Sequence, residues 1–119
     1  MSYNPILIVS GEPNSIFLEI FFKVIKLKKI KSPIILISSE NILRKQMKKL
    51  KVKNKINLLN YKNFNFKKLN NKSINLINID FNQKKPFQKI SKKSNAFIEK
   101  SFQIAFEIIR KKKVYKFIN

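Results

Sequence analysis

The sequence contains no cysteine and no histidine, and its only glycine is Gly11. The absence of cysteine excludes disulfide bonds and thiolate chemistry. The absence of histidine removes the commonest general base and the commonest zinc ligand. Carboxylates are also scarce, because the chain holds only six acidic residues. The sequence alone therefore points to no catalytic residue and to no metal-ligating residue.

Arginine is scarce as well, although the chain carries a net charge of +21. Such a charge suggests a polyanionic partner, so a small basic RNA- or DNA-binding module is the alternative interpretation of the sequence. The basic residues are nearly all lysines spread along the chain, and only Arg44 and Arg110 offer the planar fork that grips a phosphate. Lysine, asparagine and isoleucine dominate, as an AT-rich genome would produce. We expect a solvated lysine surface, with nucleic acid an unlikely partner.

Long apolar runs are missing too. The most apolar stretch, residues 16–25, is interrupted by Glu19 and Lys23, and a membrane-spanning helix needs about twenty apolar residues. The N-terminus lacks the basic segment that opens a secretion signal. We therefore expect no membrane association and a cytoplasmic location.

What is present is an alternation of short apolar runs with amphipathic segments. Continuous apolar runs predict strands at residues 6–9 and 34–37, the second covered on both faces. Further strands are expected at 56–59, at 74–79 as an edge strand with one polar face, and at 114–118 as a central strand. Helical spacing predicts helices at 15–29, at 40–50 capped by Ser39, and from Ser91 or Ser94 to about Lys112. The fold class is α/β, with three α/β/α layers around a mostly parallel sheet.

Two segments carry details that a structure can test. In the first helix, the spacing of five apolar residues predicts the inward face. These are Phe17, Ile20, Phe21, Val24 and Leu27. Ile16, Leu18, Phe22 and Ile25 broaden that face, so we expect the helix to be buried on much of its surface. In the irregular connection 61–73, three aromatic residues stand among lysines, so they either stack on single-stranded bases or, as we favour, pack inward. They are Tyr61, Phe64 and Phe66.

One loop has chemical potential, the stretch of residues 11–15 between the first strand and the first helix. Open α/β sheets bind ligands at the carboxyl ends of their strands, where this loop lies. Its N–H groups could hold a phosphate, as in a nucleotide-binding regulatory domain, with Glu12 orienting the ligand. Alternatively it is a tight turn in which Glu12 complements the helix dipole. The loop matches neither the phosphate-binding nor the dinucleotide-binding glycine motif.

The same stretch resembles the N-terminus of the 4-hydroxythreonine-4-phosphate dehydrogenase family, where a strand precedes a Gly-Asp/Glu-Pro-Ala-Gly-Ile-Gly-Pro-Glu motif. The matching positions are Gly11, Glu12, Pro13, Ile16 and Glu19. Residues 33–43 resemble the family's next segment. Residues 94–105 are similar to its Asn-Gly-x-Tyr-x-x-x-x-Leu-x-x-Ala helix, which leads to a strand and a Gly-Pro-x-x-Lys loop; the sequence given stops where that loop would begin.

The resemblance implies the front part of an isocitrate/isopropylmalate dehydrogenase-like fold, acting in vitamin B6 (pyridoxal phosphate) biosynthesis. It implies a homodimer that oxidises and decarboxylates a small phosphorylated hydroxy amino acid with NAD and a divalent metal held by histidines. This chain has no histidine, so only Gly11, Glu12 and Pro13 carry over, as a cleft-lining loop. We expect residues 1–119 to be a single incomplete domain, the N-terminal part of a longer chain. Alone it is expected to be inactive and to bind NAD and metal poorly.

Overall fold

A computed structural model describes residues 4–27, 29–112 and 116–119, apart from the side chains of Phe66 and Lys112. Its centre is a sheet of five strands in the order β3-β4-β2-β1-β5, and every pair in it is parallel. The strands are β1 (Ile6–Val9), β2 (Ile34–Ser38), β3 (Lys55–Leu58), β4 (Ser73–Asn78) and β5 (Lys116–Ile118). The expected parallel sheet is confirmed.

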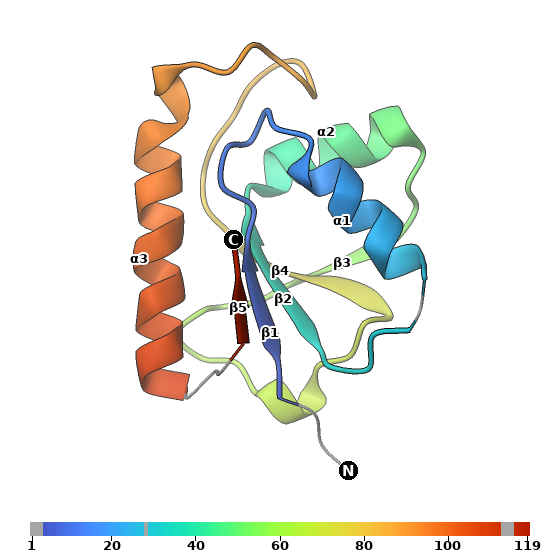
Figure 1. Cartoon of the computed structure of the whole chain (residues 1–119), viewed down its shortest axis with the longest axis vertical. Helices are drawn as coiled ribbons and strands as arrows, with labels where there is room; N and C mark the ends of the chain where they lie inside the picture. Colours follow the sequence, from blue (N-terminus) through green and yellow to red (C-terminus); the bar gives the residue numbers. More distant parts are fainter. Residues whose placement is uncertain (1–3, 28, 113–115) are drawn as a thin grey trace.

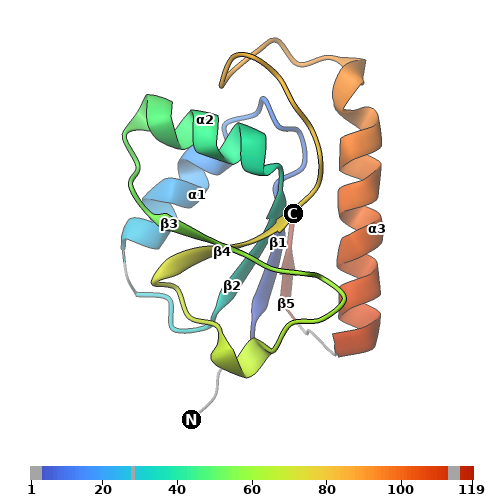
Figure 2. The ribbon, with the colours of Figure 1, turned by 180° about the vertical axis from the view of Figure 1, so that it is seen from behind.

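Three helices complete the layers: α1 (Phe17–Lys26), α2 (Glu40–Leu50) and α3 (Asn95–Lys112). Helices α1 and α2 cover one face of the sheet and α3 covers the other (Figures 1 and 2). Because side chains alternate along a strand, β1 and β2 supply both cores. Ile8, Ile34 and Leu36 join the α1–α2 core, while Leu7 and Ile35 join the α3 core. All five residues of β2 are buried, as its continuous apolar run predicts.

The expectation that β4 is an edge strand is wrong, because β4 lies between β3 and β2. Its asparagines suggested a polar face, but Asn75 is buried. The Asn75 Nδ2 donates to the carbonyl oxygens of Ile34 at 3.0 Å and Asn70 at 2.9 Å, and its Oδ1 accepts from Asn57 at 3.0 Å. A side chain satisfied in this way can be buried at little cost, so an asparagine in a strand does not mark the solvent face.

The opposite error concerns β5, which was expected to be a central strand and lies at the end of the described sheet, beside β1. Residues 114 and 115 of that predicted strand lie outside the described residues.

The ends of α1 also differ, since the helix covers Phe17–Lys26 and not the whole of 15–29. Helix α2 has the predicted bounds, and its predicted cap is confirmed by the Ser39 Oγ, which accepts from the Ile42 N–H at 3.3 Å.

The predicted inner face of α1 is confirmed in part. Leu18, Phe21 and Phe22 are its buried residues, whereas Ile20 and Leu27 of the predicted stripe are 49% and 62% exposed. The helix is apolar almost all round, so periodicity alone fits more than one face. The contacts with β1, β2 and α2 select among them.

The connection after β3 packs its described aromatics inward. Tyr61, Phe64 and Leu69 contact the core between the sheet and α3, so packing and not base stacking is confirmed for the two rings that the structure describes. The side chain of Phe66 lies outside the described part. No described helix is long and apolar enough to cross a membrane.

Candidate functional site

The strands all point the same way, so their carboxyl ends meet at one edge of the sheet. The loop of residues 10–16 after β1 and the long segment 79–94 after β4 both lie there, side by side at the end opposite the N-terminus (Figures 1 and 2). This edge is the place where open α/β sheets bind ligands. It is also where the sequence places Gly11, Glu12 and Pro13.

Gly11 has a backbone φ of +71°, in the left-handed region that favours glycine. A Cβ built on it would meet the Asn119 Oδ1 at 3.6 Å, which is an ordinary contact. The glycine is therefore required by the turn and not by lack of space. The same geometry places Gly11 beside the end of β5, so the first and last described segments of the chain meet here.

Glu12 is half-buried, and its two carboxylate oxygens have protein partners. One accepts from the Asn14 N–H at 3.2 Å, and the other accepts from the Ser94 Oγ at 2.6 Å. Ser94 is buried and directly precedes α3. The carboxylate therefore links the loop after β1 to the start of α3, two segments that are 82 residues apart in sequence.

Three backbone N–H donors of this loop are bonded within the loop itself. The Asn14 N–H bonds the Glu12 side chain, the Ser15 N–H bonds the Glu12 carbonyl at 3.2 Å, and the Phe17 N–H bonds the Ser15 Oγ at 3.2 Å. The Glu12 carboxylate also lies close to the start of α1 and accepts from the Asn14 N–H. A phosphate bound at this helix start would compete with the carboxylate for backbone N–H donors. The geometry favours the turn interpretation over the phosphate cradle.

Pro13 is buried, and its carbonyl is held from α2. The Gln46 Nε2 donates to the Pro13 carbonyl at 3.0 Å and to the Pro86 carbonyl at 3.1 Å. Gln46 is completely buried, and among the described atoms its Oε1 has no hydrogen-bond partner. This one side chain thus joins both loops of the carboxyl edge to α2.

A second clamp joins the same two loops. The side chains of Asn14 and Gln83 exchange hydrogen bonds of 2.7 and 3.2 Å, and the Asn14 Oδ1 also accepts from the Gln88 N–H at 2.9 Å. Lys45 of α2 donates to the Gln83 carbonyl. Polar side chains therefore hold segment 79–94 against the loop after β1.

Sequence reasoning missed most of these polar connectors. The sequence marks Ser94 only as a possible helix start, and no local pattern singles out Gln83. Gln46 had a detectable signal, because it falls on the inner stripe of α2 with Ile42, Leu43 and Met47. A polar residue on an apolar helix stripe indicates a buried hydrogen-bonding role.

Two hollows on this molecule bear on ligand binding. One, of about 320 Å³, lies at the carboxyl edge between β2, β4 and the start of α2, lined by Ser39, Glu40, Asn41, Arg44, Asn78, Asp80, Phe81 and Asn82. Gly11, Glu12 and Pro13 do not line it. The other, of about 590 Å³, is lined by the end of α1 and the start of β2. A cleft-lining role for the Gly11 loop therefore stays a prediction.

The described residues hold no group of three or more His, Cys, Asp or Glu side chains arranged to bind a metal ion. Glu107, on α3, has a pKa below its ordinary value because it accepts a hydrogen bond from Lys111, with further lowering by nearby positive charges. This carboxyl lies far along α3 from the carboxyl edge. It pairs one helical turn away, which is a surface arrangement.

Comparison with known proteins finds a likeness among solved structures. Neither a scan against protein-family models nor a comparison with curated protein sequences finds a match. Among solved structures, a 4-hydroxythreonine-4-phosphate dehydrogenase from Burkholderia phymatum superposes with a TM-score of 0.77 at 14% sequence identity. The match covers 100% of this chain and 38% of the dehydrogenase chain. The chain therefore has the fold of a part, well under half, of this dehydrogenase.

Proposed function

We propose that this chain is a scaffold part of a 4-hydroxythreonine-4-phosphate dehydrogenase-like fold, in which residues 1–119 form one incomplete domain. The observation that supports the proposal is the superposition of the whole chain on 38% of the solved dehydrogenase. The resemblance of the motif around Gly11, Glu12 and Pro13 to the family's N-terminal motif agrees with it. On this proposal the larger fold belongs to vitamin B6 biosynthesis and takes NAD and a small phosphorylated substrate.

The chain by itself is proposed to be inactive. The metal implied by the family is held by histidines, and this sequence has none. The described acids do not compensate, since they form no cluster fit for a cation. Glu12, the one acid in the loop of residues 10–16 after β1, already accepts hydrogen bonds on both carboxylate oxygens. The residues present therefore do not fit a catalytic metal.

The test is NAD reduction by the purified chain with the phosphorylated hydroxythreonine substrate and a divalent cation, followed by absorbance. The expected result is no turnover above a protein-free blank. The Burkholderia phymatum dehydrogenase, assayed in parallel, shows that substrate and conditions are competent. Turnover that copurifies with this chain would refute the claim that it is inactive alone.

The cleft-lining role of Gly11, Glu12 and Pro13 is proposed for the completed fold and not for this chain alone. Thermal melting with and without NAD or inorganic phosphate checks this. Neither compound should raise the melting temperature of the wild-type chain or of Glu12→Gln, because the N–H groups of Asn14, Ser15 and Phe17 are already bonded within the loop. A rise in wild type that Glu12→Gln abolishes would instead support an independent anion site.

A further inference from the structure

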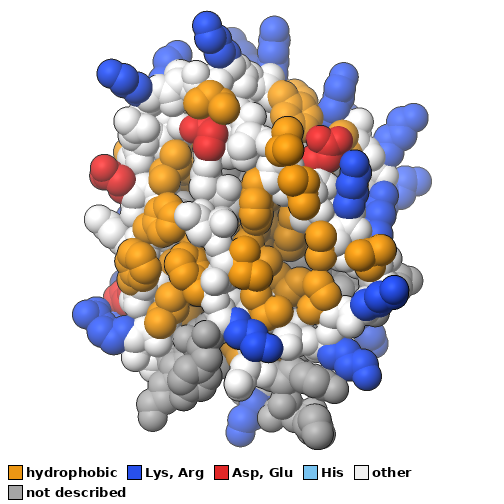
Figure 3. Space-filling view, viewed as in Figure 1, with side chains coloured by type: hydrophobic (Ala, Val, Ile, Leu, Met, Phe, Trp, Pro, Cys, Tyr) orange, Lys and Arg blue, Asp and Glu red, His pale blue; other side chains and the backbone are white. Residues whose placement is uncertain are grey.

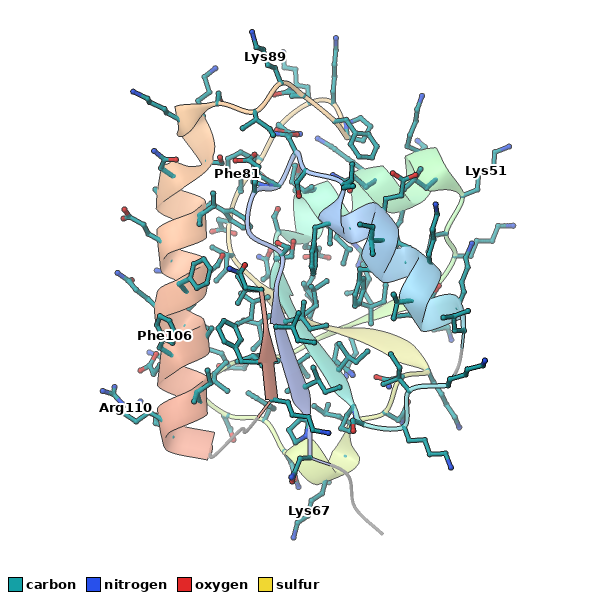
Figure 4. The ribbon with its side chains drawn as sticks, viewed as in Figure 1. Lys51, Lys67, Phe81, Lys89, Phe106 and Arg110 are labelled. Carbon is teal, nitrogen blue, oxygen red and sulfur yellow. The ribbon has the colours of Figure 1, made fainter. Side chains whose placement is uncertain are left out.

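Residues 82–93 form a strap across the carboxyl edge of the sheet, and this strap is fixed at both ends. Before it, Phe81 packs against both hydrophobic cores, and its ring centroid lies 5.3 Å from that of Phe97. After it, the buried Ser94 donates to the Glu12 carboxylate at 2.6 Å. Figure 4 shows Lys89 at the outer end of the strap, beyond Phe81.

Between these two anchors the strap adds little to the cores of the protein. Phe87 is half-buried and Ile90 is 62% exposed, and neither belongs to the core on either face of the sheet. Figure 3 shows hydrophobic side chains gathered over the middle of the view, whereas lysines project at the end that carries the strap. A segment with few buried apolar contacts opens locally at a lower free-energy cost than the sheet.

Hydrogen bonds hold the strap in place, and several of them depend on the side chain of Asn14. This side chain exchanges bonds of 2.7 and 3.2 Å with the Gln83 side chain, and its Oδ1 also accepts from the Gln88 N–H at 2.9 Å. Side chains of α2 make further bonds to the strap backbone, and they belong to Asn41, Lys45 and Gln46. Because Asn14 alone reaches two separate points of the strap, it acts as the latch.

The turn that carries Asn14 does not depend on this latch. The Asn14 N–H bonds the Glu12 carboxylate, and Ser15 bonds the Glu12 carbonyl through both its N–H and its Oγ. None of these bonds uses the Asn14 side chain. The strap can therefore be released while the turn after β1 stays formed.

The charge of the strap itself opposes the closed arrangement. The strap contains five lysines and no acidic residue. The lysines are Lys84, Lys85, Lys89, Lys92 and Lys93. Like charges held close together destabilise a compact arrangement. Neutral hydrogen bonds stabilise it only modestly, because water replaces them when they break.

Pro13, in the loop after β1, lies against the strap. The Gln46 Nε2 donates to the Pro13 carbonyl at 3.0 Å and to the Pro86 carbonyl at 3.1 Å, so it holds the two backbones side by side. Pro13 is buried although its loop lies at the outer edge of the sheet. Release of the strap would uncover Pro13 and free the Asn14 amide, at the edge where open α/β sheets bind ligands.

We propose that residues 82–93 open as a unit from the carboxyl edge while the sheet stays folded, with the Asn14–Gln83 pair as the latch, and that this opening controls access to Pro13. Loops that open and close over a site gate the entry of ligands in this way. The inference goes beyond the proposed function and does not require it. The strap acts on access to the loop after β1, whatever that loop binds.

Limited trypsin digestion of the full chain, mapped by mass spectrometry, measures the opening. Cleavage after Lys84 and Lys89 reports the strap, and cleavage after Lys48 in α2 reports unfolding of the whole chain. When opening is fast relative to cleavage, the cleavage rate follows the population of the open form. Asn14→Ala should raise strap cleavage at least about tenfold, which is about 1.4 kcal/mol, and leave cleavage after Lys48 unchanged. Asn82→Ala is the matched control, because Asn82 is an exposed asparagine beside the strap anchor whose side chain bonds no described residue.

Gln83→Ala breaks the latch from the strap side and leaves the loop after β1 unchanged. It should also raise strap cleavage, and the double variant with Asn14→Ala should be cleaved no faster than Asn14→Ala alone, because both changes remove the same contact. Strap cleavage equal to that of Asn82→Ala in both single variants would overturn the proposal. So would a parallel rise of cleavage after Lys48, since the whole chain and not the strap would then be opening.

Access to the loop is measured separately with Pro13→Cys, which introduces the only thiol of a chain without cysteine. Adding Asn14→Ala should speed the labelling of this thiol by maleimide about tenfold. Ser101→Cys is the control, because Ser101 is fully buried on α3 and should be labelled at an unchanged rate. An unchanged labelling rate for Pro13→Cys would overturn the control of access. None of these measurements uses NAD or substrate, so their failure leaves the proposed function standing.

Discussion

Replacing Ser94 with alanine removes the donor that joins the start of α3 to the loop after β1. The Ser94 Oγ lies 2.6 Å from the Glu12 carboxylate and 3.1 Å from the Ser91 carbonyl. A hydroxyl has one proton to donate, so the shorter, charge-assisted bond takes it. Hydrogen bonds to charged groups contribute about 1.5–3 kcal/mol. Glu12 is only half-buried, so we expect a loss near the lower end, about 1.5 kcal/mol.

Thermal unfolding followed by circular dichroism measures this loss. For a chain of 119 residues, the usual entropy of unfolding converts 1 kcal/mol into about 4 °C, so Ser94→Ala should melt about 6 °C lower. Ser91→Ala is the matched control, because Ser91 is exposed and its Oγ accepts only a 3.3 Å bond from the Lys93 N–H. It should cost less than about 1 kcal/mol.

A double-mutant cycle with Glu12→Gln separates the bond from other effects of the serine. If the two side chains interact as described, the cycle should show a coupling energy of about 1 kcal/mol. A coupling energy near zero, or a Ser94→Ala melt equal to that of Ser91→Ala, would refute the link between the Gly11 loop and α3.

Three other predictions concern the turn, the core and the surface. Gly11→Ala should lower the free energy of unfolding in urea by about 1–2 kcal/mol, because Gly11 has a positive φ. Gly11→Asn should lower it less, since asparagine tolerates this backbone conformation better. Equal losses for the two variants would mean that the space around Gly11, and not backbone strain, is decisive. Leu36→Ala should cost about 2–5 kcal/mol because Leu36 is fully buried in the central strand β2, against under about 1 kcal/mol for the half-exposed Leu58→Ala; similar midpoints would contradict the core assignment. The lowered pKa of Glu107 means that its pair with Lys111 stabilises the folded state above the ordinary glutamate pKa and that this is lost as pH falls through the lower folded pKa. Glu107→Gln should therefore melt slightly below wild type at neutral pH and equal to it once the carboxyl is protonated in both states, and a difference that persists in strong acid would rule out the ion pair as its cause.

The nucleic-acid alternative has lost its most specific support. Tyr61 and Phe64, the described rings that stood among lysines, contact the core under α3 and do not form a free stacking surface. The remaining argument is charge. We therefore expect only weak RNA binding that depends steeply on salt and lacks sequence preference, measured by oligonucleotide titration. Tight binding that discriminates between sequences would restore that alternative.

The sequence by itself determined the order of strands and helices along the chain, because apolar runs and helical spacing are local signals. The runs at β1 and β2, the bounds of α2 with its Ser39 cap, and the Gly11 turn could all be predicted. Because α1 is apolar almost all round, its sequence pattern does not decide which face points inward. Likewise, the polar Asn75 in β4 suggested a solvent-exposed face, although this side chain is buried.

Only the tertiary structure decided which strands are neighbours and which polar groups meet. The place of β4 inside the sheet and of β5 at its end depends on long-range pairing that no local pattern encodes. The same holds for the carboxyl edge, where Glu12 meets Ser94 and Gln46 holds Pro13 and Pro86. Hydrogen bonds are directional and short, so such partners are fixed only when the sheet brings distant segments together.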